Sequence, residues 1–483
     1  MQASTLLVIF IAYFIVLLII SFFTGRKNSN QTFFTGDKKS PWLVVAFGMV
    51  GATLSGVTFI SVPGEVGQSS FHYLQFVLGN FVGYLIIALL LLPYYYRQNV
   101  ISIYTVLSEK MGQHGYLSSS GFFILSKLIG AAFRLYLAAL VIYMAIAQPL
   151  GISFGITVLV CLLFIWLYTV KSGIKTVVWS DALQTVVLLA AVVATIISLS
   201  RQMNIKMSDL SGILTDNSYT QVFNFELHSP NNFFKQFISG IFITIALNGF
   251  DQDIIQKNLT CKNYRKAQNN MLVFSLLFVV TVFVFLVLGA MLYHFAESKN
   301  IAVPANTDQF FPLVALNYLE PVVIVLFTLG ISAAAFSSAD SATTAITTAF
   351  SIDFLKIDKK THHKHTRKIV HLGVTLLLFA IIYLFHKLNN QSVVVAIFKA
   401  AGYTYGPILG VFMFSFFINR TPRQKFILPI CLLSPIITYV ITLLACKYLN
   451  NYEFGFELII VNSLLTILFL TIFSKNERNV KKY

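Results

Sequence analysis

Apolar residues occur along the chain in blocks of about twenty, and short polar segments separate the blocks. A helix of that length crosses a hydrocarbon core roughly 30 Å thick. The blocks predict an all-α membrane protein of thirteen transmembrane helices, at residues 5–24, 41–66, 72–95, 116–148, 153–170, 176–199, 236–256, 268–296, 321–355, 368–386, 392–418, 426–446 and 454–474.

The second and the seventh predicted helices are interrupted by small and polar residues. The second contains Gly51, Ser55 and Gly56, and the seventh contains Gly249 and Asp251. The two interruptions stand five spans apart, and each interrupted span opens a group of five. Paired interruptions of this kind are typical of transporters built from two inverted repeats, which bind solute and ions at the breaks. Close helix packing through small residues is the alternative explanation.

This spacing predicts four parts of the chain. Two groups of five helices form inverted repeats that alternate around a binding site near the middle of the membrane. One helix precedes these repeats and two follow them. The predicted boundaries are 1–24 for the additional N-terminal helix, 41–199 for the first repeat, 236–418 for the second repeat and 426–474 for the two additional C-terminal helices.

Composition and charge agree with a membrane protein. Hydrophobic residues make up 57% of the chain and charged residues 11%, whereas soluble domains carry about 25% charged residues. The net charge is +16, and with the N-terminus outside, 25 of the 34 lysines and arginines fall in cytoplasmic segments and 6 in external ones. This asymmetry follows the positive-inside rule, so the charge does not indicate a nucleic-acid partner.

Four oxygen-bearing residues lie within about one turn of the ninth predicted helix, namely Ser337, Ser338, Asp340 and Ser341. Sodium prefers hard oxygen ligands, which hydroxyl groups and freed backbone carbonyls supply. A carboxylate inside a membrane helix is costly, so Asp340, and Asp181 at the start of the sixth helix, are expected to be functional. The alternatives are helix packing for the serines and an ion pair with a neighbouring helix for Asp340.

Three basic residues fall within predicted helices. Arg134 lies near the middle of the fourth helix, and its charge cannot be relieved by deprotonation. It either pairs with an intramembrane aspartate or holds the carboxylate of a substrate through its planar fork. Lys127 and Lys399 are expected to extend toward the membrane surface or to cap a polar network.

Motifs of the common enzyme classes are missing. The sequence contains no nucleophile elbow, phosphate-binding loop or zinc-protease motif. A carrier is therefore favoured over two other hypotheses. These are an integral-membrane enzyme that acts on lipid or polyprenyl substrates, and a passive channel or transporter-derived sensor.

Four segments resemble motifs of one transporter family. They are Leu92–Arg97 with the loop through Tyr104, Ser172–Gln184, Asp251–Lys257 and Ser337–Asp353. With these four motifs in this order, the chain resembles, over essentially its whole length, the sodium/solute symporter family. That family includes sodium-coupled proline, sugar, iodide and sialic acid carriers. The resemblance implies a leucine-transporter-type core of two inverted five-helix repeats.

The same resemblance implies the ligands of the coupling ion. One sodium site would use the backbone carbonyls of Gly51, Leu54 and Ala334 and the hydroxyls of Ser337 and Ser338. Members with a second sodium site imply a further set here, consisting of Asp181, Ser337, Asp340 and Ser341. The family's usual serine or threonine at position 340 is aspartate in this chain. Whether one or two sodium ions, or a proton, drive transport therefore stays open.

For the substrate, the resemblance points to sialic acid carriers. Their broken-helix motif is matched by residues 53–59, and their carboxylate-binding arginine lies, as Arg134 does, 47 residues before the signature aspartate, here Asp181. Their third-span glutamine has only the out-of-register Gln75 as a counterpart, and their seventh-span asparagine falls on Thr244. The implied substrate-binding set is Thr53, Ser55, Thr58, Gln75, Arg134 and Thr244.

We therefore expect a sodium-coupled symporter that imports a small organic solute, carboxylate-bearing and similar to sialic acid, by alternating access. A sugar, an amino acid, or a small inorganic or monocarboxylate anion is the alternative solute. The protein is expected to be a monomer in the cell membrane, with the N-terminus outside and the C-terminus in the cytoplasm. Sodium is its only expected cofactor, and its expected partners are the solute, sodium ions and the bilayer.

Overall fold

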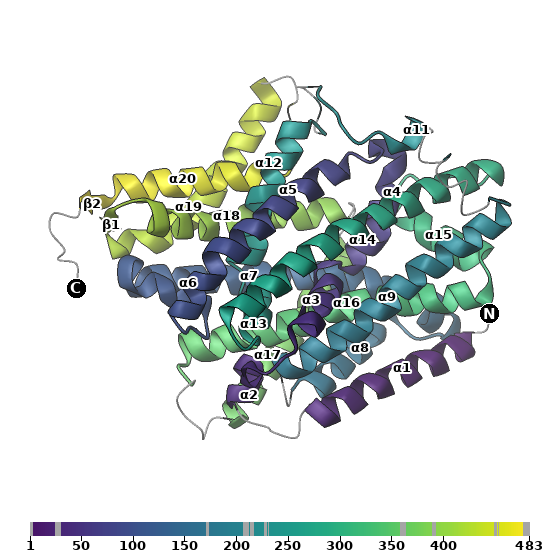
Figure 1. Ribbon diagram of the computed structural model, residues 1–483, viewed down its shortest axis with the longest axis horizontal. Helices are drawn as coiled ribbons and strands as arrows, with labels where there is room; N and C mark the ends of the chain where they lie inside the picture. The colour runs from purple at the N-terminus through teal and green to yellow at the C-terminus, as the bar shows by residue number, and fades with distance from the viewer. Residues whose placement is uncertain are drawn as a thin grey trace.

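The computed structural model describes residues 3–24, 30–170, 173–205, 212, 217–226, 229, 231–357, 364–388, 393–448, 452 and 454–476. In Figure 1 long helices pack side by side in one bundle, with α1 along one flank and α19 and α20 along the opposite flank. The sheet in the described chain is a single antiparallel pair of three-residue strands, β1 (Arg420–Pro422) and β2 (Ser474–Asn476).

Nine helical units in the described part of the chain are long and apolar enough to cross a membrane. Their helices are α1 (Ala3–Thr24), α5 (Tyr73–Ile86) continuing into α6 (Leu92–Arg97), α7 (Ser108–Ile142), α9 (Ile174–Gln202), α14 (Tyr264–Ser298), α16 (Pro321–Ala349), α17 (Lys364–Leu388), α18 (Val393–Phe417) and α19 (Gln424–Tyr448). Two shorter apolar helices are α8 (Phe154–Thr169) and α20 (Leu458–Ile472). Small helices are α2 (Asn30–Thr35), α11 (Asn217–Thr220) and α15 (Phe310–Tyr318).

Two further spans are bent pairs of helices, and both coincide with the interruptions predicted from the sequence. The first pair is α3 (Trp42–Thr53) with α4 (Gly56–Ser69), bent by 60°. The second runs from α12 (Phe233–Thr244), through the π-helical turn η7 (Ile245–Gly249), to α13 (Gln252–Leu259), with a bend of 64°. Each predicted span coincides with one of these units, whereas the count of thirteen crossings stays a prediction.

Side chains start a new helix directly after each break. Ser55 Oγ accepts a hydrogen bond from the Thr58 backbone N–H at 3.5 Å, and Asp251 Oδ1 accepts one from the Asp253 N–H at 2.8 Å. Serine and aspartate are preferred caps because their oxygens satisfy amides that have no partner in the first helical turn. The local sequence therefore explains why a helix ends and restarts at both positions.

The core of the bundle lies around α16. Every residue of α16 from Gly330 to Ala349 is buried, and this helix packs against α3, α7, α9 and α13. By contrast, α1, α17 and α19 bury only 33%, 28% and 28% of their most apolar stretch, as expected for helices whose outer face meets lipid. The polar residues predicted on the ninth span are therefore placed in the centre of the protein.

Helices α5 and α12 approach each other closely through two glycines. A Cβ atom added to Gly79 would lie 2.1 Å from the carbonyl oxygen of Phe237, and one added to Gly240 would lie 2.3 Å from that of Phe76. Small residues at helix interfaces permit such backbone contacts in membrane proteins. This contact joins α5 to the first half of the second broken span.

We predict that Gly79→Ala separates α5 from α12 and destabilises the protein by about 1–3 kcal/mol, the usual cost of overpacking. The measurement is the midpoint of thermal unfolding of the purified protein in detergent. Gly373→Ala is the matched control, because a Cβ atom there meets nothing within 4 Å. Equal midpoints for the two variants would contradict the close contact.

Candidate functional site

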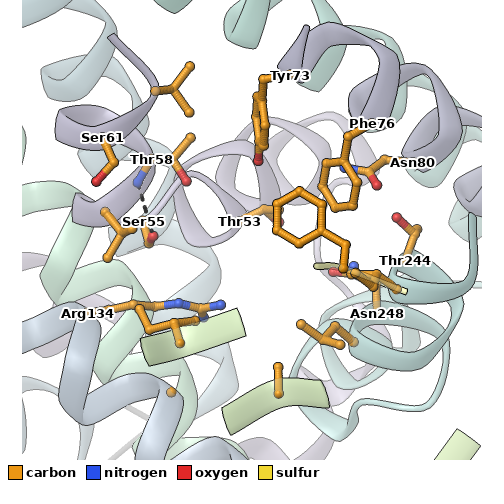
Figure 2. A pocket seen from close by; sticks show the side chains of 18 of the residues that line it. Thr53, Ser55, Thr58, Ser61, Tyr73, Phe76, Asn80, Arg134, Thr244 and Asn248 are labelled. Atoms are coloured by element: carbon orange, nitrogen blue, oxygen red, sulfur yellow. Dashed lines mark hydrogen bonds between the residues drawn. The ribbon is translucent and has the colours of Figure 1, made fainter. Parts of the chain in front are cut away.

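A cavity of about 550 Å³ lies between the two helix breaks. The first break lines it with Thr53, Ser55 and Thr58, and the second with Thr244 and Asn248. In Figure 2, Ser55 and Thr58 lie on one side of an open space, and Thr244 and Asn248 lie on the other. The structure thus brings together two segments that lie about two hundred residues apart in the sequence.

Arg134 reaches this cavity from α7. Its guanidinium group extends toward the open space in Figure 2, on the side of Ser55. Within the described residues, Arg134 forms no ion pair and no hydrogen bond. The nearby carboxylate of Asp251 is already bonded to Lys127 and to the Tyr405 hydroxyl. The ion pair with an intramembrane aspartate that was considered for Arg134 is therefore not observed among the described residues, and binding of a carboxylate stays a prediction.

Five of the six residues predicted to bind solute line the cavity, and Gln75 does not. The amide nitrogen of Gln75 donates to the carbonyls of His72 and Asn231, at 3.2 and 3.0 Å, and its oxygen accepts from the Asn224 N–H at 3.1 Å. Gln75 therefore holds the start of α5 to the segment before α12. It is not available to a solute in this arrangement.

Several cavity residues were not predicted from the sequence. On α5 they are Tyr73, Phe76 and Asn80, and α18 contributes Tyr405. Tyr73, Phe76 and Asn80 lie three and four residues apart and so share one helix face. Hydropathy does not reveal which face of a buried helix borders a cavity, and Gln75 was expected here only as the out-of-register counterpart of a glutamine in sialic acid carriers.

The first break has carbonyl groups without their usual helical partners. The Ser55 N–H donates to Thr53 O at 3.0 Å, and the Thr58 N–H donates to Ser55 Oγ. In a continuous helix these amides would bind the carbonyls of Gly51 and Leu54, the two carbonyls predicted to bind sodium. The hydroxyl of Ser338 on α16 donates to Ala52 O at 3.4 Å. Ala334 precedes Ser338 by one turn of α16, and binding of sodium by this set of oxygens stays a prediction.

The second predicted ion site is brought together only in part. Ser337 Oγ donates to Asp181 Oδ1 at 2.6 Å, and Ser341 Oγ lies 3.4 Å from Asp181 Oδ2. Asp340 contacts other partners, because its Oδ2 accepts from the hydroxyls of Tyr168 and Ser180 at 2.8 and 3.3 Å. Its Oδ1 has no hydrogen-bond partner among the described residues.

Comparisons with known proteins agree with this arrangement. The sequence profile of the sodium:solute symporter family matches residues 33–425, which is most of the chain. The chain belongs to the sodium:solute symporter family. The prediction of a sodium-coupled transporter is thereby confirmed, and the alternative of a membrane enzyme is not supported.

The symporter is similar to transporters for different solutes. It is 22% identical to the sodium/sialic acid symporter SiaT of Proteus mirabilis, over 91% of this chain and 89% of SiaT. It is 24% identical to the sodium/sialic acid symporter NanT of Aliivibrio fischeri, over 84% and 81%. The human sodium/iodide cotransporter is 22% identical over 82% of this chain, which spans only 62% of that longer protein.

Solved structures confirm a transporter fold. A sodium-coupled sialic acid symporter in a substrate-bound outward-open state superimposes with a TM-score of 0.82 at 19% identity, covering 98% of this chain and 99% of that one. Mhp1, a nucleobase-cation-symport-1 family transporter, superimposes with a TM-score of 0.55 at 11% identity, covering 92% and 93%. At these identities the likeness establishes the fold alone.

Buried charges of alternating sign join the cavity of the symporter to Asp181. Lys127 Nζ lies 3.0 Å from Asp251 Oδ2 and 2.9 Å from Asp253 Oδ2. Lys257 Nζ lies 3.4 Å from Asp253 Oδ1 and 2.9 Å from Asp181 Oδ2. Charges removed from water require such partners. Of the predicted alternatives for Lys127, capping of a polar network is the one observed, and the side chain of Lys399 lies outside the described residues.

The position of Lys257 also corrects the sequence analysis. We expected the seventh span to end at residue 256 and counted Lys257 as a cytoplasmic positive charge. The structure extends α13 to Leu259 and buries the Lys257 side chain to 1% exposure. Hydropathy placed the end of the seventh span wrongly, because a lysine lowers the local hydropathy equally in a polar loop and in a buried ion pair. Lys257, which is paired with two buried aspartates, was therefore assigned to a loop.

We predict that Lys127→Met destabilises the symporter by about 3–5 kcal/mol, because it leaves Asp251 and part of Asp253 as buried charges without a counter-ion. Thermal unfolding of the purified protein measures the effect. Lys299→Met is the control, since Lys299 is exposed and surface changes usually stay within about 0.5 kcal/mol. An unchanged midpoint for Lys127→Met would show that this ion pair does not support the fold.

Proposed function

We propose that the symporter imports a small, carboxylate-bearing organic solute together with sodium, by alternating access. The observation that carries the proposal is the Arg134 guanidinium, which has no ion-pair partner among the described residues and lies in a cavity bordered by both helix breaks. A cation in a partly dry cavity requires an anion, and its planar fork suits a carboxylate. The names of SiaT and NanT support a sialic acid or a similar sugar acid as the solute.

We propose two inverted repeats, residues 41–199 and 236–418, as the moving parts. The additional helix within 1–24 and the two within 426–474 complete thirteen crossings. The two bent spans support this division, because they open their groups of five and have similar bends of 60° and 64°. We further propose a monomer in the cell membrane, with the N-terminus outside and the C-terminus in the cytoplasm.

The structure then corresponds to an outward-facing state. On the side that this topology assigns to the exterior, the cavity extends to Gln68, Ser69, Asn231 and Phe456. On the opposite side, hydrogen bonds close the path. Gln252 binds the backbone of Ile103 and Ile101 at 2.9 and 2.7 Å, and Tyr104 OH donates to Phe250 O at 2.9 Å. Solute would enter from outside, and these contacts would open for its release.

Sodium is proposed to bind between the first break and α16. The carbonyls of Gly51, Leu54 and Ala334 and the hydroxyl of Ser338 supply hard oxygen ligands. Ser337 completes the predicted set, although its hydroxyl faces Asp181 in this structure. An ion at this place would join the first repeat to α16 of the second repeat. Each positive charge carried inward contributes about 2.3 kcal/mol per 100 mV of membrane potential.

We predict that Ser338→Ala abolishes sodium-stimulated solute uptake into proteoliposomes, because it removes one ligand of a small, hard cation. Ser332→Ala is the matched control on the same helix. The Ser332 hydroxyl is buried and binds only Thr328 O, one turn earlier, among the described residues. Wild-type uptake that is equally fast without a sodium gradient would refute the coupling mechanism.

The solute is best identified by a thermal-shift screen of sugars, amino acids, sialic acids and small carboxylates, with and without sodium. We predict that Arg134→Gln weakens binding of the stabilising acid about 10- to 100-fold, since a hydrogen bond to a charged group contributes about 1.5–3 kcal/mol. Arg201→Gln is the control, because Arg201 is exposed at the end of α9. Stabilisation by neutral solutes alone would instead favour a sugar carrier.

A further inference from the structure

Phe456 lies at the outer end of the cavity, although the helix that follows it is outside the two proposed repeats. It precedes α20 and lines the cavity together with Phe76 of α5. The centroids of the two rings are 4.7 Å apart. Asn80 lines the cavity one turn further along α5, which is the cytoplasmic side of Phe76 in the proposed topology (Figure 2). The contact between the two rings therefore lies between the exterior and the deeper part of the cavity.

Helix α18 has short side chains next to Phe456. Ala400 and Ala401 contribute to the cavity wall, and Ala401 and Phe456 also line a small void beside Leu247 of η7. At this level the Phe456 ring supplies the bulk that the alanines lack. The void leaves the ring room to shift, which side chains in a closely packed core do not have.

The interface between α18 and α20 is unusually close. Three glycines of α18 recur every four residues, at Gly402, Gly406 and Gly410, and so share one helix face. A Cβ atom added to Gly406 would lie 2.5 Å from Asn462 Cγ, and one added to Gly410 would lie 2.6 Å from a side chain of α20. The Asn462 amide nitrogen donates to the carbonyl oxygens of Gly402 and Tyr403, at 3.0 Å each. Small residues and hydrogen bonds of this kind hold membrane helices together, so α20 is fixed to α18.

The segment before α20 meets α5 and α12 through contacts that break more easily. One is the contact between the rings of Phe456 and Phe76. Another is a cation–π contact, in which Lys235 Nζ of α12 lies 4.9 Å from the centroid of the Tyr452 ring. Single contacts of these types each contribute little energy. Helices α5 and α12 thus form one side of the cavity mouth, and α18 with α20 forms the other.

We propose that Phe456 is the outer lid of the solute cavity, and that α18 and α20 move as one unit to open and close it. This inference rests on the proposed alternating access. Solute enters when the unit carries Phe456 away from Phe76, and it is enclosed when the two rings meet again. Closure of an aromatic side chain over the site also excludes water from it. A helix outside the two repeats thereby takes part in transport.

Thiol labelling of the cavity tests the lid without any solute. Asn80→Cys, in a Cys446→Ser background because the other native cysteines are buried, is exposed to a bulky, membrane-impermeant maleimide outside intact cells. Phe456→Ala is expected to speed labelling about 2- to 10-fold, the change in open population that corresponds to loss of one aromatic contact. Thr58→Cys is a second reporter position and should respond in the same way. Leu464→Ala is the control, because Leu464 lies on the exposed face of α20, and equal rates with and without the Phe456 ring would overturn the lid.

Two cross-links test the joint movement of α18 and α20. A Cβ atom added to Gly402 lies 3.3 Å from Leu458 Cβ, close to the separation of about 3.5–4.5 Å in a disulfide. Oxidation of Gly402→Cys with Leu458→Cys should leave sodium-driven uptake of radiolabelled sialic acid unchanged. Phe76→Cys with Phe456→Cys, joined by a short reversible dithiol reagent, should lose uptake and regain it on reduction. Uptake lost through the first bridge, or retained through the second, would overturn the proposal.

The two tests separate the lid from the proposed function. Labelling that changes as expected, together with no sodium-driven uptake of sialic acid by the wild type, would refute sialic acid as the solute and leave the lid intact. Sodium-driven uptake by the wild type, together with equal labelling rates in Phe456→Ala, would refute the lid alone.

Discussion

Backbone amides and carbonyls inside a membrane must find partners within the protein, and this constraint governs every polar feature of the symporter. The two broken spans meet it differently. At the second break, Tyr95 OH donates to Gly249 O and Tyr104 OH to Phe250 O, both at 2.9 Å. At the first break, no side chain among the described residues donates to the carbonyls of Gly51 and Leu54. The two breaks have similar bends but differ chemically: among the described residues, side-chain hydroxyls donate to the carbonyls of Gly249 and Phe250, and none donates to those of Gly51 and Leu54.

The same constraint explains how far the sequence could predict the site. Spans and breaks were predictable because lipid demands long apolar helices and because interruptions need small or capping residues such as Gly51, Ser55 and Asp251. Arg134 was a candidate because a fixed charge inside a helix is costly. These signals depend on residue type and position along the chain, which the sequence states directly.

Contacts between helices were not predictable in this way. Which residues of α5 face the cavity depends on the rotation of this helix about its axis, and a buried, mostly apolar helix gives no clear sign of that rotation. Lys257 illustrates a second limit. A polar residue at this point of the sequence indicates a loop, and only the folded structure shows that Asp181 and Asp253 lie next to the lysine. The pairing of residues 181 and 257, which lie 76 positions apart, can be seen only in the folded structure.

The buried charges suggest why an anionic solute would depend on sodium. Around the cavity and the second predicted ion site, the four aspartates 181, 251, 253 and 340 together with Lys127, Lys257 and Arg134 carry one net negative charge when every group is ionised. A carboxylate that enters the cavity alone adds a second negative charge in a region of low dielectric constant. One sodium ion at the first break offsets that added charge. If one sodium ion and one carboxylate bind together, as in the proposed mechanism, the net charge of the set is the same before and after binding, whereas binding of the carboxylate alone makes it more negative.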